Sequence, residues 1–277
     1  MKPVDPKGFF SRDYQPVVTV DAGEPVVFSA LNAGWRWDEQ IEEPQPDGAG
    51  HALFGPIEVR GARAGATLVV HIDEVVPRSW GATFAPDVKL VWSLEADTWT
   101  SERGARVPAA PFLGVIGMPP PEPGEHPTGP PRKWGGNIDC KLLVAGTTLY
   151  LPIPVDGALL LAGDGHGAQG DGEVSGTAIE CPLERAQLRF ELSDLDLRSP
   201  IARVGDTWVA FGFDADLDLA AEQAMATMLD LMERERGLDR NHALALASVG
   251  VDLAITQIVN GVKGVHAILH DSAFSGS

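Results

Sequence analysis

Apolar and polar residues alternate over much of the chain, which is the pattern of half-buried β-strands. Runs rich in Val, Ile, Leu, Phe and Thr occur at residues 16–20, 24–31, 66–75 and 188–192. Gly, Pro, Asn or Asp interrupt these runs, and the runs recur too closely to leave room for crossover helices. We therefore expect a mainly β protein with some α, whose antiparallel sheets form a sandwich or a barrel.

The apolar spacing becomes helical near the C-terminus. Apolar side chains recur at intervals of three and four residues from Leu217 to Met232, after Asp216 as an N-cap and before Gly237 as a stop. A second, shorter pattern follows Asp239. These patterns predict a C-terminal helical hairpin, with the methionines packing against a sheet. The helices are expected near 217–236 and 240–249, and a closing β-hairpin at 251–259 and 265–270.

One glycine-rich segment, LAGDGHGAQGDGEVSGTAIE at residues 161–180, concentrates ionisable side chains. It places Asp164, His166, Asp171 and Glu173 among six glycines, with Gln169 between them. Glycine lets a backbone approach a ligand closely, because no Cβ obstructs it. Carboxylates and an imidazole are ligands for a divalent cation and acid–base groups for hydrolysis. The alternative is a solvated acidic loop or a plain calcium loop.

A second segment, GGNIDCK at residues 135–141, carries three polar side chains at period two. On an extended strand, Asn137, Asp139 and Lys141 would share one face. An amide, a carboxylate and an ammonium group on one face are unusual for a core strand, where an unpaired charge is costly. We expect this face to form the wall of a site; the alternative is an exposed face with a salt bridge.

Composition narrows the class of protein. The chain has 277 residues, 44% of them hydrophobic, and 39 acidic against 21 basic residues give a net charge of −18. This charge disfavours binding to nucleic acid or to an anionic membrane surface. No apolar run reaches the ~18 residues that cross a bilayer, and the first residues do not read as a signal peptide. We therefore expect a cytoplasmic protein that binds neither nucleic acid nor membrane, with Cys140 and Cys181 as buried thiols.

The length allows one or two domains. We predict a β-rich N-terminal region at 1–110 and a β-rich catalytic region at 111–277, which holds both polar segments and both helices.

The two polar segments together resemble the acetamidase/formamidase family of amide hydrolases. GGNIDCK and the run GTTLYLPIPVDGALLLAGDGHGAQGDGEVSGTAIE carry the resemblance. The stretches GPIEVRGARAGATLVVHI and PFLGVIGMPP, and the pattern over 217–257, extend it to roughly residues 17–270. The resemblance implies a metal-dependent hydrolase that splits a small linear amide into a carboxylate and ammonia.

The chain departs from the family pattern in two places, SALNAGWRW near Asn32 and APDVKLVWSLEADTWT at 85–100. Both places are rich in tryptophan, whose side chains could shape a different substrate pocket. We therefore expect acetamide and formamide to be poor substrates relative to some larger amide. Core positions or a subunit interface are the alternative for these tryptophans.

Metal ligands can be assigned within the resemblance. Asp139 and His166 are the best candidates, Asp164 is the third, and His51 is added because some family members have a histidine before the GPI motif. Zinc suits mixed imidazole and carboxylate ligands, and calcium or magnesium would suit an all-oxygen shell. A partly exposed loop histidine is the alternative for His51.

The remaining roles follow from what amide hydrolysis requires. Glu173 is the expected general base and acid, because the reaction needs a carboxylate that is not consumed as a ligand. Lys141 is expected to stabilise the oxyanion, and Asp139 counts as catalytic because it would hold the ion. Asn137, Gln169 and Asp171 are expected to contact the substrate.

Two alternative functions stay open. One is a metal-dependent hydrolase of an ester or a cyclic amide, and the other is a non-catalytic β-sandwich binding module stabilised by calcium. Because family members tend to be oligomers, we also expect a homo-oligomer, a dimer or higher.

Overall fold

The computed structural model describes residues 5–274 as strands in four sheets and two α-helices. The predicted mainly β fold with antiparallel sheets and a C-terminal helical hairpin is confirmed. A five-stranded sheet carries the polar segments. It contains β12 (Gly135–Asn137), β10 (Phe112–Gly117), β14 (Leu160–His166), β4 (Leu53–Val59) and β2 (Val18–Val20), in that order.

An eight-stranded sheet forms the other large layer. Its order is β18 (Val251–Gln257), β19 (Lys263–His270), β17 (Thr207–Asp214), β16 (Ile201–Val204), β13 (Thr148–Pro152), β5 (Thr67–Pro77), β15 (Leu183–Ser193) and β3 (Pro25–Ala30). One large apolar cluster contains side chains of both sheets, including Ile72 and Phe190 from the larger and Leu113 and Leu160 from the smaller. Burial of these side chains is what favours the sandwich.

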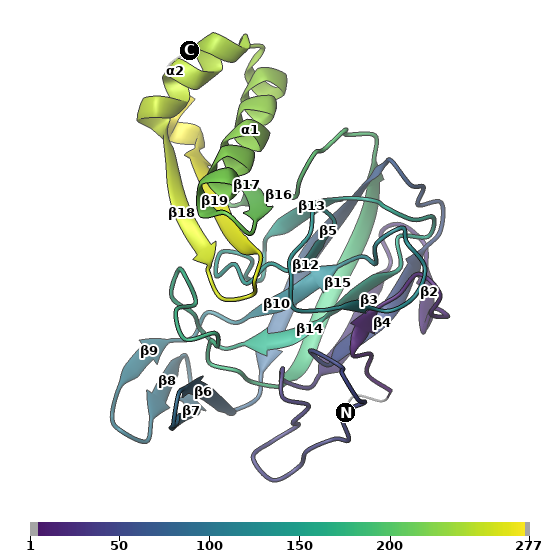
Figure 1. The fold of residues 1–277 in the computed structure, drawn as a ribbon, viewed down its shortest axis with the longest axis vertical. Coiled ribbons are helices and arrows are strands. Elements are labelled where there is room, and N and C mark those ends of the chain that lie inside the picture. The colour runs from purple at the N-terminus through teal and green to yellow at the C-terminus, as the bar shows by residue number, and fades with distance from the viewer. Residues whose placement is uncertain (1–4, 275–277) are drawn as a thin grey trace.

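Two smaller sheets complete the strands. A four-stranded sheet consists of β6 (Trp80–Ala85), β7 (Val88–Glu95), β8 (Thr98–Ser101) and β9 (Arg106–Pro108), and β1 (Phe9–Phe10) pairs with β11 (His126–Pro127). In Figure 1 the four-stranded sheet lies at the end of the molecule opposite the two helices.

Helix α1 begins and ends where the sequence predicts, and α2 is one residue longer than predicted. Helix α1 spans Leu217–Arg236 and α2 spans Arg240–Gly250, and a 3₁₀ turn covers Asp271–Phe274. The Asp216 side chain accepts hydrogen bonds from the first turn of α1, and Gly237 ends that helix with a φ of 64°. The methionines Met228 and Met232 pack in an apolar cluster that includes Ala210 and Ala267 of the sheet below. Neither helix of the described chain combines the length and the apolarity needed to span a bilayer.

One local expectation needs correction, and one strand pair departs from the antiparallel arrangement. Strand β12 ends at Asn137, and Asp139 has a φ of 52°, so the period-two face proposed for residues 137–141 does not exist. Strand β2 pairs with β4 in parallel, which breaks the antiparallel rule at one edge. The division at residue 110 stays a prediction, although strands from both sides of it share the two large sheets.

Candidate functional site

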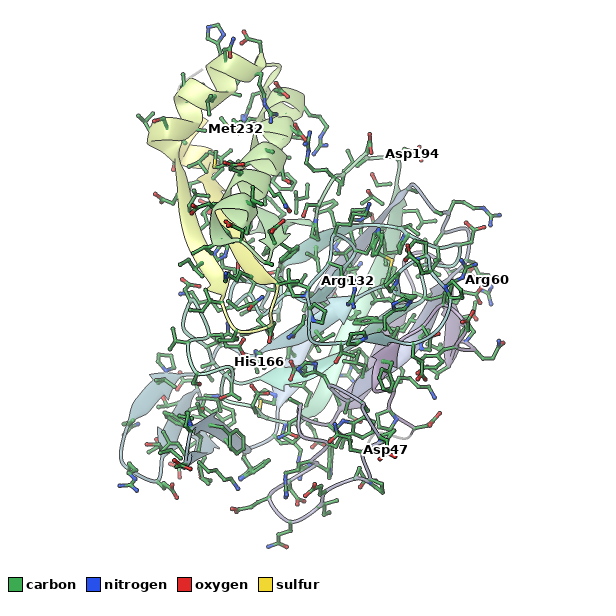
Figure 2. The ribbon with its side chains drawn as sticks, in the orientation of Figure 1. Asp47, Arg60, Arg132, His166, Asp194 and Met232 are labelled. Carbon is green, nitrogen blue, oxygen red and sulfur yellow. The ribbon has the colours of Figure 1, made fainter. Side chains whose placement is uncertain are left out.

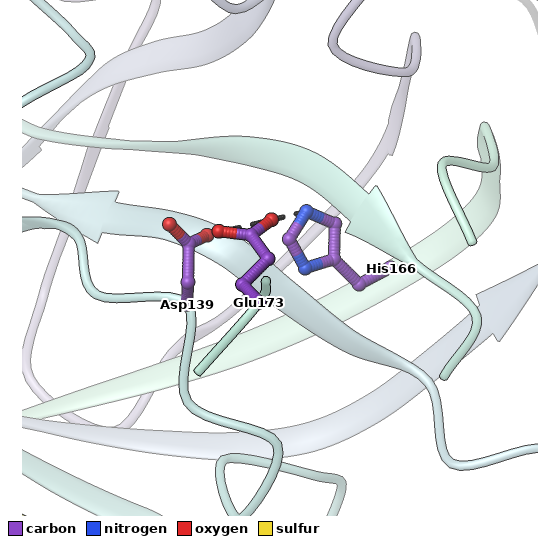
Figure 3. A group of neighbouring side chains, drawn as sticks. All are labelled: Asp139, His166 and Glu173. Atoms are coloured by element: carbon purple, nitrogen blue, oxygen red, sulfur yellow. Dashed lines mark ion pairs between the residues drawn. The ribbon is translucent and has the colours of Figure 1, made fainter. Parts of the chain in front are cut away.

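Four carboxylates surround one buried imidazole at the end of β14. The ligand atoms of Asp139, His166 and Glu173 lie within 4.8 Å of one another, and so do those of Asp164, His166 and Glu180. Figure 3 shows the first group, with the Glu173 carboxylate beside that of Asp139 and the imidazole facing both. In Figure 2 His166 lies near the middle of the molecule, whereas Arg60 and Asp194 lie at its margins. The structure thus brings together two sequence segments predicted to form a site.

Strand β14 places two of these side chains on one face. Asp164 and His166 are two positions apart on the strand, and both lie over Gly114 of the neighbouring β10. A Cβ atom at Gly114 would come within 2.6 Å of Asp164 Oδ2 and 2.8 Å of His166 Nε2. Only glycine at this position leaves room for the imidazole and the carboxylate to pack against β10.

Three of the carboxylates belong to residues with a left-handed backbone. The φ angles are 52° for Asp139, 58° for Asp164 and 44° for Glu173. Such backbone is uncommon for residues other than glycine, and clusters of it are typical of functional sites. At Asp139 the turn is held by the carbonyl of Gly114, which accepts hydrogen bonds from the backbone N–H groups of residues 138 and 139. The turn is therefore what directs the Asp139 side chain inward after β12 ends.

Gln169 fixes the tautomer of His166. Its Nε2 donates to the backbone carbonyl of Asp139 at 2.7 Å, so its Oε1 is the atom that faces the ring. His166 Nδ1 lies 2.9 Å from that oxygen and must donate to it. The other ring nitrogen, Nε2, then faces Asp164 Oδ2 at 3.3 Å, Glu180 Oε1 at 3.4 Å and Asp139 Oδ1 at 4.0 Å. In the neutral ring this nitrogen carries a lone pair that three carboxylates face. A proton or a cation bound between them would remove the resulting repulsion.

The pKa values reflect this crowding. Burial by itself would lower the pKa of His166, but Glu180, Asp164 and Asp139 raise it well above its ordinary value. Burial raises the pKa of Glu180 to about 8 and that of Glu173 to about 7, while His166 opposes both shifts. Burial and the neighbouring Glu173 raise the pKa of Asp139. Burial would also raise the pKa of Asp164, but His166 and His51 hold it below its ordinary value. The site therefore carries excess negative charge that favours bound protons or a cation.

Several oxygen atoms in the site are buried and without a hydrogen-bond partner in the described part of the chain. They are Oδ1 of Asp139, Oδ1 of Asp164 and Oε2 of Glu180; Oδ1 of Asn137, two residues before Asp139, also lacks a partner among the described residues. Buried polar atoms normally have partners, because leaving one unpaired is costly. Carboxylate oxygens and one imidazole nitrogen at these separations fit the ligand preferences of a divalent cation.

The β-hairpin formed by β18 and β19 contacts the site. Asn260, in the turn between β18 and β19, donates from Nδ2 to Asp139 Oδ2 at 2.7 Å. Two backbone hydrogen bonds, from Gly172 to Thr256 and from Ile258 to Gly172, join this hairpin to the loop that carries Glu173. Asn260 is not among the predicted site residues, because no local sequence signal marks it. Glu180 is not among them either, although that carboxylate closes the glycine-rich segment.

The other predicted residues take different places. Lys141 Nζ and Asp171 Oδ2 form an ion pair at 2.7 Å. His51 belongs to neither group of ligand atoms. Its Nε2 lies 3.9 Å from Asp164 Oδ2, and its Nδ1 lies 2.8 Å from Thr128 Oγ1. Asn137 is buried at the end of β12, two residues before Asp139.

Both cysteines are buried free thiols, as the sequence predicts. Burial raises the pKa of Cys140 to about 12. Because the thiolate is the nucleophilic form, this high pKa argues against Cys140 as a nucleophile.

A cleft of about 590 Å³ opens beside the site. Its polar lining includes Lys141, Gln169, Asp171 and Glu173. Glu173 is 6% exposed, and it is the one member of either carboxylate–imidazole group that lines this cleft in the described chain. A molecule bound in the cleft would therefore contact the site through Glu173.

One solved structure and two further proteins are similar to this chain. An acetamidase from Bacillus halodurans has a crystal structure with a TM-score of 0.87 and 29% sequence identity, over 96% of this chain and 95% of that one. The acetamidase of Mycolicibacterium smegmatis is 26% identical over 199 residues, 45% of this chain and 49% of that protein. A relative from Schizosaccharomyces pombe is 27% identical over 230 residues, 54% and 55% of the two chains. The chain thus spans about half the length of these two curated relatives.

The sequence profile of the Acetamidase/Formamidase family matches residues 124–269, which is more than half of the chain. The matched residues include the turn at Asp139, the strand with Asp164 and His166, and the loop with Glu173. On this match and the described fold, the chain belongs to the acetamidase/formamidase family.

Proposed function

We propose that the protein hydrolyses the C–N bond of a linear amide to a carboxylate and ammonia. One observation carries the proposal: Glu173 belongs to the group formed with Asp139 and His166 and also lines the cleft. A carboxylate at the boundary between a substrate-sized cleft and a cluster of ligand atoms can act on both water and substrate. Membership of the acetamidase/formamidase family supports the same reaction.

A divalent metal is part of this proposal. Asp139 and His166 would hold it, with Asp164 as a third ligand, and Glu180 is a further carboxylate within reach. Zinc suits this mixture of imidazole and carboxylate better than calcium or magnesium does. When bound, such an ion acidifies a water molecule and polarises a carbonyl oxygen. His51 would act from further away, on Asp164.

The side chains of the protein would manage the protons and the charge. Glu173 would take a proton from the attacking water as the new C–O bond forms. It would then give that proton to the nitrogen as the C–N bond breaks, so that ammonia leaves. Lys141, held at the cleft wall by Asp171, would stabilise the negative charge on the former carbonyl oxygen. Asn137 and Gln169 would orient the reacting groups, and Gln169 does so through His166.

Ammonia release by the purified protein tests this proposal. We expect turnover of amides that falls after treatment with a chelator and returns when zinc is added. Metal analysis of the same samples should show bound ion rising and falling with activity. Activity that is unchanged in metal-free protein would contradict the metal assignment, and the absence of any amide turnover would contradict the reaction.

The homo-oligomeric state and the cytoplasmic location remain predictions of the sequence. Light scattering during gel filtration would test the first, and fractionation of the source cells would test the second.

A further inference from the structure

We infer that the preferred substrate is a neutral primary amide whose acyl group is apolar and clearly larger than acetyl. This inference rests on the proposed amide hydrolysis. It follows from the cleft beside Glu173, from the residues that form its walls, and from where those residues lie in the chain.

The cleft is large for the substrates that the family name suggests. Formamide and acetamide carry only a hydrogen atom or a methyl group on the carbonyl. The cleft measures about 590 Å³, which lies within the range of pockets that enclose much larger ligands. A methyl group would leave most of the lining uncovered, and uncovered apolar lining contributes nothing to binding.

Two apolar walls face the space. The four-stranded sheet contributes Trp92 from β7 and Val107 and Pro108 from β9. The Trp92 ring is 7% exposed, and its Nε1 donates to Thr83 Oγ1 at 3.1 Å, so the ring is held in place. The loop beyond Glu173 contributes Val174 and Ile179. Val174 is 79% exposed, and a bound acyl group would cover it.

The charges in the cleft select against an anionic acyl group. Lys141 is the one cationic side chain that lines the cleft within residues 5–274, and it is already paired with Asp171. Asp171 and Glu173 add negative charge to the same lining. A carboxylate on the substrate would meet like charges without a free partner, whereas a neutral hydrocarbon chain would not.

The sheet wall also lies outside the family match. Residues 80–108, which form β6 to β9, precede the matched residues 124–269. They include the tryptophan-bearing stretch 85–100 that departs from the family pattern. The groups proposed for the reaction lie mainly in the matched part, as does the wall formed by Val174 and Ile179, whereas the wall formed by the four-stranded sheet precedes it. This chain can therefore share the reaction of the family and still prefer a substrate of a different size.

The test is kcat/KM across a graded series of primary amides: formamide, acetamide, butyramide, isovaleramide and benzamide, with succinamate as an anionic comparison. A methylene group in an apolar pocket is worth about 10- to 200-fold. We expect the best neutral amide of the series to exceed acetamide by about 100-fold or more. Succinamate should be no better than acetamide.

Two variants locate the effect in the cleft. Val107→Thr keeps the shape of the side chain and adds a hydroxyl group to the sheet wall. Val174→Ser shortens the exposed wall of the loop. Each should lower the ratio of kcat/KM for the best large amide to that for acetamide, by about tenfold. The matched control is Val249→Ser, which changes a valine that is 87% exposed on α2, and it should leave the ratio unchanged.

The possible failures can be told apart. If formamide or acetamide has the highest kcat/KM, or if succinamate is preferred, the inference is wrong while amide hydrolysis stands. If neither cleft variant moves the ratio more than the control does, the cleft is not the acyl site. If no amide is hydrolysed, the proposed function fails and the inference with it.

Discussion

Two histidines in different regions of the molecule are equally buried and yet electrostatically opposite. His166 on β14 and His266 on β19 are each 1% exposed. Carboxylates raise the pKa of His166, whereas burial lowers the pKa of His266 to about 4. His266 has a hydroxyl partner, Thr256 Oγ1 at 2.8 Å, and the Phe211 ring nearby. Burial alone therefore does not mark a functional histidine; the charges that surround the ring do.

The largest expected effect comes from removing His166, the first of the two histidines. His166→Ala removes the nitrogen that faces three carboxylates, so we expect bound metal to be lost and kcat/KM to fall by about 10⁴-fold or more. His266→Phe keeps an aromatic ring in the other region and should retain most activity. Metal analysis and kinetics on both variants would check this. Equal losses in the two would mean that burial, rather than the carboxylates, sets the role of His166.

The next effect separates a proton carrier from a ligand inside the His166 region. Glu173→Gln should lower kcat by about 10³-fold while bound metal stays near the wild-type content, because a general base acts on water without holding the ion. Asp139→Ala should lose metal and activity together. If metal content falls as far in Glu173→Gln as in Asp139→Ala, Glu173 is a ligand and another group carries the proton.

Sequence patterns could distinguish these histidines only through their neighbours. His166 follows Asp164 at period two and stands in a run of glycines, whereas His266 stands among apolar residues in VHAILH. Local spacing also predicted both helices with their caps, because Asp216, Asp239 and Gly237 act within one turn. Each of these features depends on residues close together in the chain, so it can be predicted from local sequence patterns.

The parts of the site that were not predicted depend on contacts between residues far apart in the chain. Asn260 reaches Asp139 from 121 positions away, through a hairpin that docks on the loop at Gly172. The left-handed turn at Asp139 is held by the carbonyl of Gly114 on another strand, which is why a straight strand through residues 137–141 was the wrong expectation. Trp35, Trp37, Trp92 and Trp99 are all buried core residues, and Trp92 also lines the cleft. Tertiary packing decided each of these cases.

The low pKa of His266, the second of the two histidines, predicts how the stability of the protein depends on pH. The gap between an ordinary pKa of 6.5 and about 4 in the folded protein corresponds to about 3 kcal/mol. Between these values the unfolded chain binds a proton that folded His266 does not. Its contribution to the free energy of unfolding therefore falls as the pH drops from 6.5 towards 4. Asp171 and Lys141 act on this ring in opposite directions.

Urea unfolding of the wild type and of His266→Phe at several pH values between 7 and 4 would measure this contribution. The wild type should lose more stability than the variant over that range, by up to about 3 kcal/mol. Val249→Ser on α2 offers a control, because it removes no titratable group and should follow the wild type. Parallel curves for the wild type and His266→Phe would show that His266 does not titrate as its surroundings imply.

The smallest expected effect concerns the hydrogen bond on the far side of the His166 ring. Gln169 accepts a hydrogen bond from Nδ1 of His166 and donates one to the Asp139 carbonyl. It therefore fixes the positions of two proposed ligands relative to each other. Partners of this kind are worth about 10- to 100-fold in metal affinity or activity. Gln169→Leu should therefore weaken zinc binding by about that factor with little change in melting temperature. Gln169→Glu keeps the acceptor for Nδ1–H and should recover part of the affinity. If Gln169→Leu instead lowers the melting temperature while the zinc affinity is unchanged, Gln169 only supports the loop and the ring is oriented by the carboxylates alone.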